Sequence, residues 1–275
     1  INFLMKNTFL KISLSILILI TLNACQEVID IDLNTSNSQY VITGGISNDY
    51  SPCVIKIAKT ANFSDTNNFP AVTGAVVTLK DDSGDTETLL ETTSGTYQTK
   101  NTIGKAGHTY TLTVKHDGKT FTSVSKMANE NPLISIQFLK NNFGAPPGSK
   151  DTLPTFTCVP IHTDEPNIKN FYRYIQTING VQDKTFLIRN DVFNDGKLNA
   201  QPIFSRAIVH AGDTYHLKME NIDENVYTYF FSLNQSSGNG PGGGTTPTNP
   251  PNNISGGALG YFSAYSVTEI NTVVK

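Results

Sequence analysis

The cysteine at position 25 is the residue whose setting points to a definite reaction. It follows Leu22, Asn23 and Ala24 at the end of an apolar run. A basic start, an apolar middle and a small residue before the cleavage point are the three parts of a secretory signal peptide. A cysteine directly after the small residue predicts lipidation. In that reaction the Cys25 thiol is alkylated with diacylglycerol, and Cys25 becomes the mature N-terminus.

A second candidate for chemistry is an acidic loop in the second half of the chain. Asp191, Asn194 and Asp195, followed by Gly196, resemble part of a calcium-binding loop. Phe193 occupies a position where such a loop needs an oxygen ligand. A hairpin turn is therefore the favoured interpretation. We expect neither a metal nor a cofactor, and the three residues remain the candidates for a cation.

Other motifs also have a plain structural interpretation. Residues 162–165 bring together a histidine and two acidic residues, as a charged loop before Pro166 also would. Thr152 lies in an Asp-Thr-Leu pattern that some Bacteroidota use for O-glycosylation, and a polar turn explains it equally well. The chain has no hydrolase elbow, phosphate loop, zincin motif or paired-cysteine zinc pattern. We therefore expect that the protein is not an enzyme.

The apolar run before Cys25 has a competing interpretation as a membrane anchor. Ile12–Leu22 as a helix would span roughly 16 Å, about half of a ~30 Å hydrocarbon core. It is too short to remain as a spanning helix. Residues 1–24 are thus predicted to be a signal peptide, with residues 1–4 an extension upstream of Met5. Because a bacterial lipoprotein carries two or three acyl chains, the lipid would anchor it stably to a membrane.

Composition excludes some classes of partner. The chain has 20 Lys and Arg against 23 Asp and Glu, a formal net charge of −3, and no basic cluster. This balance argues against nucleic acid as a partner. No stretch after Cys25 approaches the ~20 apolar residues of a spanning helix.

The two remaining cysteines are expected to be separate thiols. Cys53 and Cys158 lie in what we predict to be different domains. A disulfide would require Cα atoms within about 7 Å of each other. We favour two partly buried thiols that behave as small hydrophobic side chains.

The elements that would hold these residues are mainly β-strands. Residues 25–38 are predicted to be a flexible tether, because their acidic and Asn/Ser-rich composition cannot form a core. Residues 39–128 contain about seven short β-rich runs separated by turns, typical of an antiparallel sandwich. In residues 109–114, tyrosine, leucine and valine alternate with threonine, which puts one face in the core.

Residues 132–275 are predicted to be a second β-rich domain with one short helix. Strands are expected at several runs, including 203–209 and a final one from Gly257. A helix is expected near 223–235, with Asp223 as its N-cap and apolar residues at helical spacing. Residues 236–253, rich in Gly, Pro, Asn, Ser and Thr, are expected to be a mobile loop.

Motifs in the first sandwich carry a resemblance to a known fold. The pattern lies in the segments Pro70 to Gly84, Ser94 to Tyr97 and Ala106 to Val114. With them the domain resembles a transthyretin-like or carboxypeptidase-regulatory-like Ig sandwich. Modules of that group usually space, support or bind, so the resemblance implies no catalytic residues.

Further motifs extend the resemblance over nearly all of the mature chain. They are the Cys25 start, the strand 40–45 and the segments 170–174, 190–197 and 253–262. The chain resembles domain-of-unknown-function family 4249, outer-membrane lipoproteins of Bacteroidota. The resemblance implies a two-part β-rich lipoprotein associated with TonB-dependent outer-membrane transport, on the cell surface or the periplasmic face. Its ligand is left open.

The sequence therefore leaves three candidate functions open. The first is a non-enzymatic lipoprotein that assists a TonB-dependent outer-membrane barrel by capturing a ligand or contacting the barrel. The second is a structural or adhesive module of the cell envelope. The third is an unrecognised hydrolase, for which the sequence offers no nucleophile and base in one motif.

Overall fold

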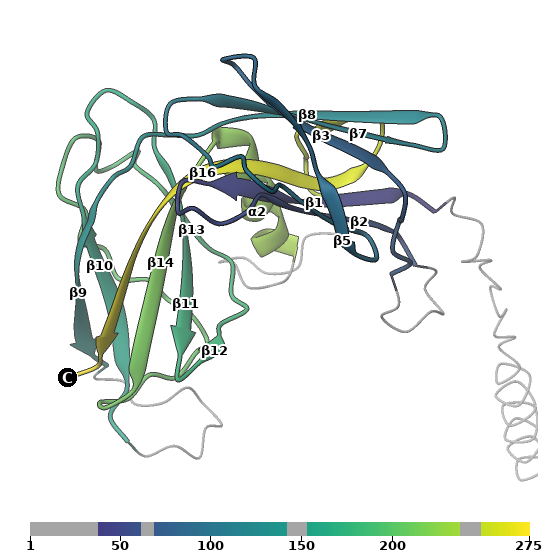
Figure 1. Cartoon of the computed structure of the whole chain (residues 1–275). Coiled ribbons are helices and arrows are strands. Elements are labelled where there is room, and N and C mark those ends of the chain that lie inside the picture. The colour runs from purple at the N-terminus through teal and green to yellow at the C-terminus, as the bar shows by residue number, and fades with distance from the viewer. Residues whose placement is uncertain (1–37, 62–68, 142–152, 237–248) are drawn as a thin grey trace, which may run out of the picture. The chain divides into compact units, whose positions relative to one another are not determined.

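The computed structural model describes residues 38–61, 69–141, 153–236 and 249–275. These residues are mainly β, and they contain one helix, α2 (Glu224–Ser236). This confirms the predicted fold class. Residues Ser38–Lys275 form one compact unit (Figure 1).

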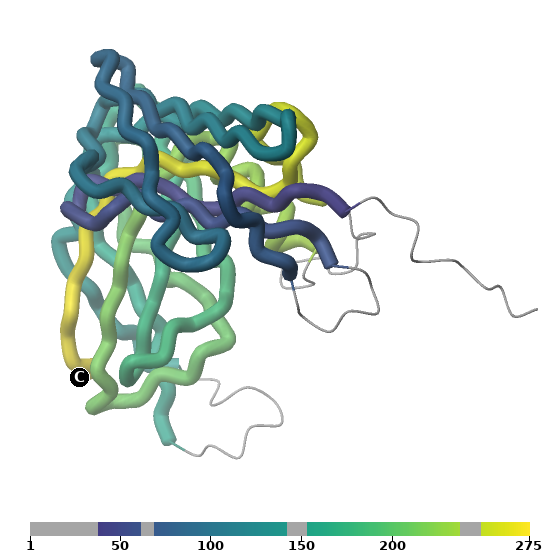
Figure 2. The backbone as a smooth tube through the Cα atoms, turned by 45° about the vertical axis from the view of Figure 1, so that its right-hand side comes forward, coloured from purple at the N-terminus to yellow at the C-terminus, as the bar shows by residue number. Residues whose placement is uncertain are grey.

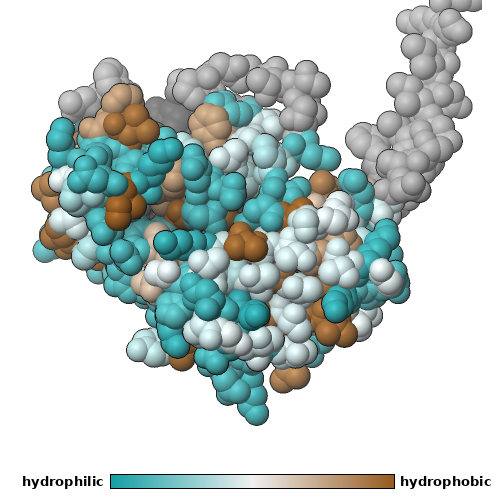
Figure 3. Space-filling model, turned by 90° about the horizontal axis from the view of Figure 1, so that it is seen from above, coloured by the Kyte–Doolittle hydropathy of each residue, from teal (hydrophilic) through white to brown (hydrophobic). Residues whose placement is uncertain are grey.

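The first sandwich consists of two layers of strands, and residues 109–114 have the alternating burial that the sequence predicted. One layer contains the first part of β16 (Leu259–Val273), followed by β1 (Tyr40–Ser47), β2 (Val54–Lys59), β6 (Thr96–Gln98) and β5 (Leu90–Thr93). The other contains β15 (Ile254–Ser255), β8 (Lys119–Lys126), β7 (Thr109–His116), β3 (Val76–Asp81) and β4 (Thr86–Thr88). Tyr110, Leu112 and Val114 of β7 are buried between the layers with Ile42 and Ile55. Seen from above, hydrophobic residues are scattered among hydrophilic and intermediate ones on the outside (Figure 3).

The second sandwich is smaller and rich in buried tyrosine. Its larger layer contains β12 (Val181–Gln182), β11 (Phe171–Ile178), β14 (Thr214–Ile222) and the rest of β16, with β13 (Leu187–Asn190) also paired to β11. Its smaller layer is β9 (Leu133–Lys140) with β10 (Phe156–His162). Tyr172, Tyr174 and Tyr215 lie in the core between them with Leu217 and Met219.

Strand β16 belongs to both sandwiches. Residues 259–265 pair in parallel with β1, and residues 266–273 pair antiparallel with β14. Figures 1 and 2 show this yellow strand beside β1 over one part and beside β14 over the other. The larger layers of both sandwiches are therefore one continuous sheet. The parallel β1–β16 pair departs from the all-antiparallel first sandwich that we expected, and the end of the predicted second domain helps to close the first core.

Helix α2 begins where the sequence predicted. Asp223 accepts a hydrogen bond of 2.9 Å from the Val226 backbone N–H, as an N-cap residue does. Val226 and Phe230 are buried, and Tyr229 and Leu233 pack against the same cluster. The apolar spacing therefore marked the buried side of the helix correctly.

The strand expected at 203–209 does not form. Ile203 and Val209 are buried, and each forms a backbone hydrogen bond with β10. The Ile203 N–H donates to the Cys158 carbonyl, and the Val209 carbonyl accepts from the Phe156 N–H. Between them, Ser205 Oγ accepts a local hydrogen bond from the Ala207 N–H, and Phe204 is exposed. A side-chain oxygen that bonds its own backbone competes with a strand ladder. The segment therefore contacts β10 mainly near its ends.

Candidate functional site

The two faces of the continuous sheet differ in what covers them. Phe262 and Ala264 of β16 are buried in the first core. Because side chains alternate along a strand, Tyr261, Ser263 and Tyr265 lie on the opposite side. Helix α2 packs on that opposite side, where its aromatic residues contact the ring of Tyr261. We call this side, opposite to both sandwich cores, the open face.

A hollow of about 400 Å³ lies on the open face. Its charged lining residues come from four elements: Asp49 after β1, Lys56 of β2, Arg173 of β11, and Lys218 and Glu220 of β14. Small-molecule sites usually have volumes of roughly 300–1,000 Å³. The hollow therefore has the size of a site for a small ligand.

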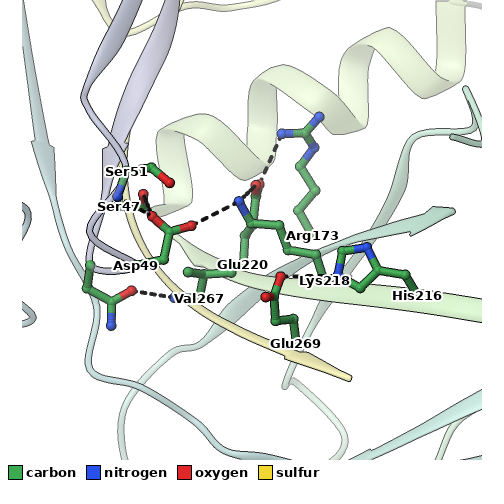
Figure 4. A network of polar contacts seen from close by, with 10 residues as sticks. Ser47, Asp49, Ser51, Arg173, His216, Lys218, Glu220, Val267 and Glu269 are labelled. Carbon is green, nitrogen blue, oxygen red and sulfur yellow. Dashed lines mark hydrogen bonds and ion pairs between the residues drawn. The ribbon is translucent and has the colours of Figure 1, made fainter. Parts of the chain in front are cut away.

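An ion-pair network crosses one wall of the hollow (Figure 4). Arg173 Nη1 donates a hydrogen bond of 3.0 Å to Glu220 Oε2. Lys218 Nζ lies 3.8 Å from Glu220 Oε1 and 3.5 Å from Asp49 Oδ2. The Glu220 side chain is only 4% exposed, and a buried carboxylate is tolerated when cations and hydrogen bonds compensate its charge. The network therefore joins β11, β14 and the segment after β1.

Asp49 is held in its charged form at the mouth of the network. Its Oδ1 accepts hydrogen bonds from Ser47 Oγ at 2.6 Å and from the Ser51 N–H at 3.0 Å. Partial burial alone would raise the pKa of Asp49, but these hydrogen bonds and Lys218 hold it below its ordinary value. Its carboxylate can therefore accept a hydrogen bond from a ligand at neutral pH.

Both cations of the network make cation–π contacts with aromatic rings. The Arg173 guanidinium lies 4.3 Å from the centre of the Phe230 ring of α2, and Lys218 Nζ lies 5.3 Å from that of Tyr265. Burial raises the pKa of Tyr261 and, with Glu220, that of Tyr265. Both phenols are therefore neutral, and their rings supply apolar surface in the hollow.

Two groups in the lining lack the partners that the others have. Lys56 makes no ion pair with the residues that the structure describes, and its side chain is exposed. Ser263 is 3% exposed, and its Oγ has no hydrogen-bond partner there either. Between their strands lies Gly45, where an added Cβ would clash with the Ser263 carbonyl oxygen and would lie 3.2 Å from the Tyr265 ring. Lys56 and Ser263 are thus polar lining residues without partners among the described residues, and the strand between them carries a glycine, Gly45.

The acidic loop that the sequence singled out lies next to a third acidic residue, Asp164. Carboxylate oxygens of Asp191 and Asp195 lie within 4.8 Å of each other and of Asp164. Asp164 and Asp191 are buried, and such oxygens suit a hard cation such as Ca²⁺. Each carboxylate also accepts a backbone hydrogen bond, from Gly196, Asn170 and Asn167 for Asp164, Asp191 and Asp195. These bonds hold the turns at 191–197, so a turn forms as expected, but it is not a hairpin, because β13 and the next strand, β14, each pair with β11 and not with each other.

His162, which the sequence grouped with Asp164, is fully buried. Its Nδ1 bonds the Thr163 carbonyl at 3.0 Å, so Nδ1 carries the proton, and Nε2 accepts from the Tyr174 hydroxyl at 2.9 Å. Burial lowers its pKa. Both ring nitrogens of this neutral imidazole are therefore used inside the protein.

Of the other residues that the sequence singled out, the structure describes only some. Cys25, Thr152 and most of the predicted tether and 236–253 loop lie outside the described residues. Cys53 and Cys158 are free and buried, as expected, and burial raises the pKa of each thiol to about 12.

The sequence did not identify the residues of the hollow. The available signal was the pair of charged residues two positions apart, Lys218 and Glu220, together with Arg173 between two tyrosines. Charges at such positions ordinarily indicate a solvent-facing strand. Only the strand pairing places them beside each other.

Comparison with known proteins gives a family match. A family model described as a domain of unknown function (DUF4249) matches residues 26–271. None of the curated proteins matches the chain. In the described part of the chain, the helix is neither long nor apolar enough to cross a membrane.

Proposed function

The chain belongs to the DUF4249 family, and from this premise we propose that it is a lipid-anchored, exported binding protein without catalytic activity. We further propose that it serves a TonB-dependent uptake system of the outer membrane in Bacteroidota. It would be displayed on the cell surface or the periplasmic face, and it would capture a small ligand or contact the transport barrel.

The hollow on the open face is the observation that carries the binding role. It combines a volume typical of small-ligand sites with several charged groups and two aromatic rings, which suits a polar ligand. Its strands are fixed because the opposite side of the same sheet carries both cores. A ligand would therefore meet a preformed surface.

The absence of catalysis is supported by what surrounds the reactive side chains. The Ser263 hydroxyl has no base within hydrogen-bonding distance among the described residues. His162 uses both ring nitrogens internally. Neither residue is thus prepared as a nucleophile or a general base.

The anchor is supported by the position of Cys25. The matched family region begins at residue 26, directly after Cys25 and the apolar run that precedes it. A lipid at this position would attach the binding domain to a membrane through the short segment before Ser38.

The test is lipid labelling combined with capture of partners. Cells of a Bacteroidota host that express the full chain are fed a tagged fatty acid, with Cys25→Ser as the variant and Cys53→Ser as the matched control. We expect label on the wild type and on Cys53→Ser, and none on Cys25→Ser. Normal labelling of Cys25→Ser would refute the anchor.

The same membranes, solubilised in mild detergent, test the partner. Co-purification of an outer-membrane TonB-dependent barrel with the labelled protein supports the uptake role. Cell adhesion that depends on the protein, with no barrel recovered, would instead favour the structural or adhesive alternative.

A further inference from the structure

One positive charge in the hollow has no counter-ion. Three cations line it, and Arg173 and Lys218 are paired with the two carboxylates, Asp49 and Glu220. Lys56 is the third cation, without an ion-pair partner among the described residues. An anionic group on a ligand would therefore complete the charge balance.

The free hydroxyl lies on the same face as this cation. Gly45 of β1 pairs with Ser263 on β16 and with Val54 on β2, and Lys56 follows two residues after Val54 on the same face. Ser263 thus lies directly beside Gly45, whereas Lys56 lies beside Thr43, two residues further along, and both face the hollow from the two strands next to β1. The Ser263 Oγ is a buried donor without an acceptor, and such a group gains free energy when a ligand supplies one.

The far side of the hollow is suited to hydroxyl groups. Asp49 keeps an ionised carboxylate there, fixed through Oδ1 by Ser47 and Ser51. An ionised carboxylate accepts hydrogen bonds but donates none, so its neutral partners are hydroxyl or amide groups. The rings of Tyr261 and Tyr265 also line the hollow and offer apolar surface for carbon atoms.

We propose that the hollow binds a small carboxylic acid that also carries hydroxyl groups, the chemistry of an acidic monosaccharide. The ligand carboxylate lies over β1 and accepts hydrogen bonds from Lys56 Nζ on one side and Ser263 Oγ on the other. A ligand hydroxyl donates to Asp49. The assignment rests on the proposed function, because it names the ligand class of the same site.

Isothermal titration calorimetry with a soluble form that begins at Gln26 tests this assignment. The probes are D-glucuronate, D-glucose, which has the same ring without the carboxylate, and acetate, which has the carboxylate without the ring. We expect glucuronate to bind with a Kd of about 1 mM or lower. Glucose and acetate should each bind at least about tenfold more weakly, since each lacks one set of contacts.

Two variants and two matched controls locate the site. Lys56→Gln and Ser263→Ala should each weaken glucuronate binding at least about fivefold. Lys115→Gln removes an exposed lysine from β7, and Ser123→Ala removes another buried hydroxyl without a partner, from β8. Both controls lie on the sheet that does not line the hollow, and they should bind like the wild type.

The stability of Ser263→Ala separates binding from folding. Because Ser263 Oγ makes no hydrogen bond among the described residues, its removal should not lower the melting temperature while it weakens binding. No glucuronate binding by the folded wild type, or equal binding of glucuronate and glucose, would overturn the ligand class. Lipid labelling and barrel co-purification do not depend on this result, so the proposed function fails or holds separately.

Discussion

Arg173 reaches from β11 to β14, and its Nη1 donates a hydrogen bond of 3.0 Å to Glu220 Oε2 on the open face of the sheet. The Glu220 side chain is 4% exposed, and that of Arg173 is 20% exposed. The pair is therefore largely removed from water, unlike an ordinary surface salt bridge. This position makes the pair an element of the fold as well as a wall of the hollow.

Removal of Arg173 should destabilise the protein strongly. Arg173→Ala leaves Glu220 buried with Lys218 at 3.8 Å as its nearest remaining cation, and we expect a loss of about 2–4 kcal/mol in the free energy of unfolding. Lys169→Ala is the control, because its pair with Glu224 has side chains that are 78% and 63% exposed. It should cost no more than about 0.5 kcal/mol. Equal losses in urea unfolding would contradict the buried character of the Arg173–Glu220 pair.

The N-cap of α2 should be separable from its charge. Asp223→Ala removes the acceptors for the Val226 N–H and the Ser125 hydroxyl and should cost about 1–2 kcal/mol, whereas Asp223→Asn keeps the cap acceptor and should be more stable than the alanine variant at neutral pH. Urea unfolding measures both. A loss for the asparagine variant as large as for alanine would show that the charge, not the cap, matters.

The same residue gives a pH dependence of defined sign. Burial raises the pKa of Asp223 above its ordinary 3.8, so between the two values the folded state holds a proton that the unfolded state has lost. Stability from this group is therefore fully present below 3.8 and is lost as pH rises through the folded pKa. Relative to Asp223→Asn, the wild type should gain stability as pH falls towards 3.8. An unchanged difference between the two proteins would contradict this.

His162 should act in the opposite direction. Its pKa is lowered below the ordinary 6.5, chiefly by burial, so stability from the neutral ring is present above 6.5 and is lost as pH falls through the folded pKa. Compared with the wild type, His162→Gln should lose less stability on acidification below 6.5. Leu217→Ala, a core variant without a titrating group, controls for destabilisation alone. A His162→Gln profile that parallels the wild type would refute the assignment.

The two described cysteines should be unreactive until the protein unfolds. With pKa values of about 12, roughly one thiol in ten thousand is a thiolate at about pH 8, and the thiolate is the reactive form. A thiol reagent should therefore label Cys53 and Cys158 slowly in the native form that begins at Gln26, and both rapidly in denaturant. Fast native labelling of either would show that its site opens locally.

Local features of this fold follow from the sequence, whereas the pairing of distant strands does not. Asp223 and the spacing of Val226 and Phe230 predict a capped helix, and alternation in β7 predicts a half-buried strand, because these depend on neighbouring residues. Nothing near Leu259 indicates a parallel partner more than 200 positions earlier. The hollow and the Asp164–Asp191–Asp195 group depend on such distant pairings. Periodicity alone therefore could not identify either.

The sharing of β16 has a consequence for how the chain is made. Ile42 and Ile46 of β1 lie in a core that Phe262 and Ala264 complete, so the first sandwich lacks a strand until residues near 265 have been synthesised. Contacts between such distant residues form slowly, because a long loop must close first. A nascent chain would thus stay without its complete first core through most of its synthesis. Late closure of the first core is therefore a direct consequence of sharing β16 between the two sandwiches.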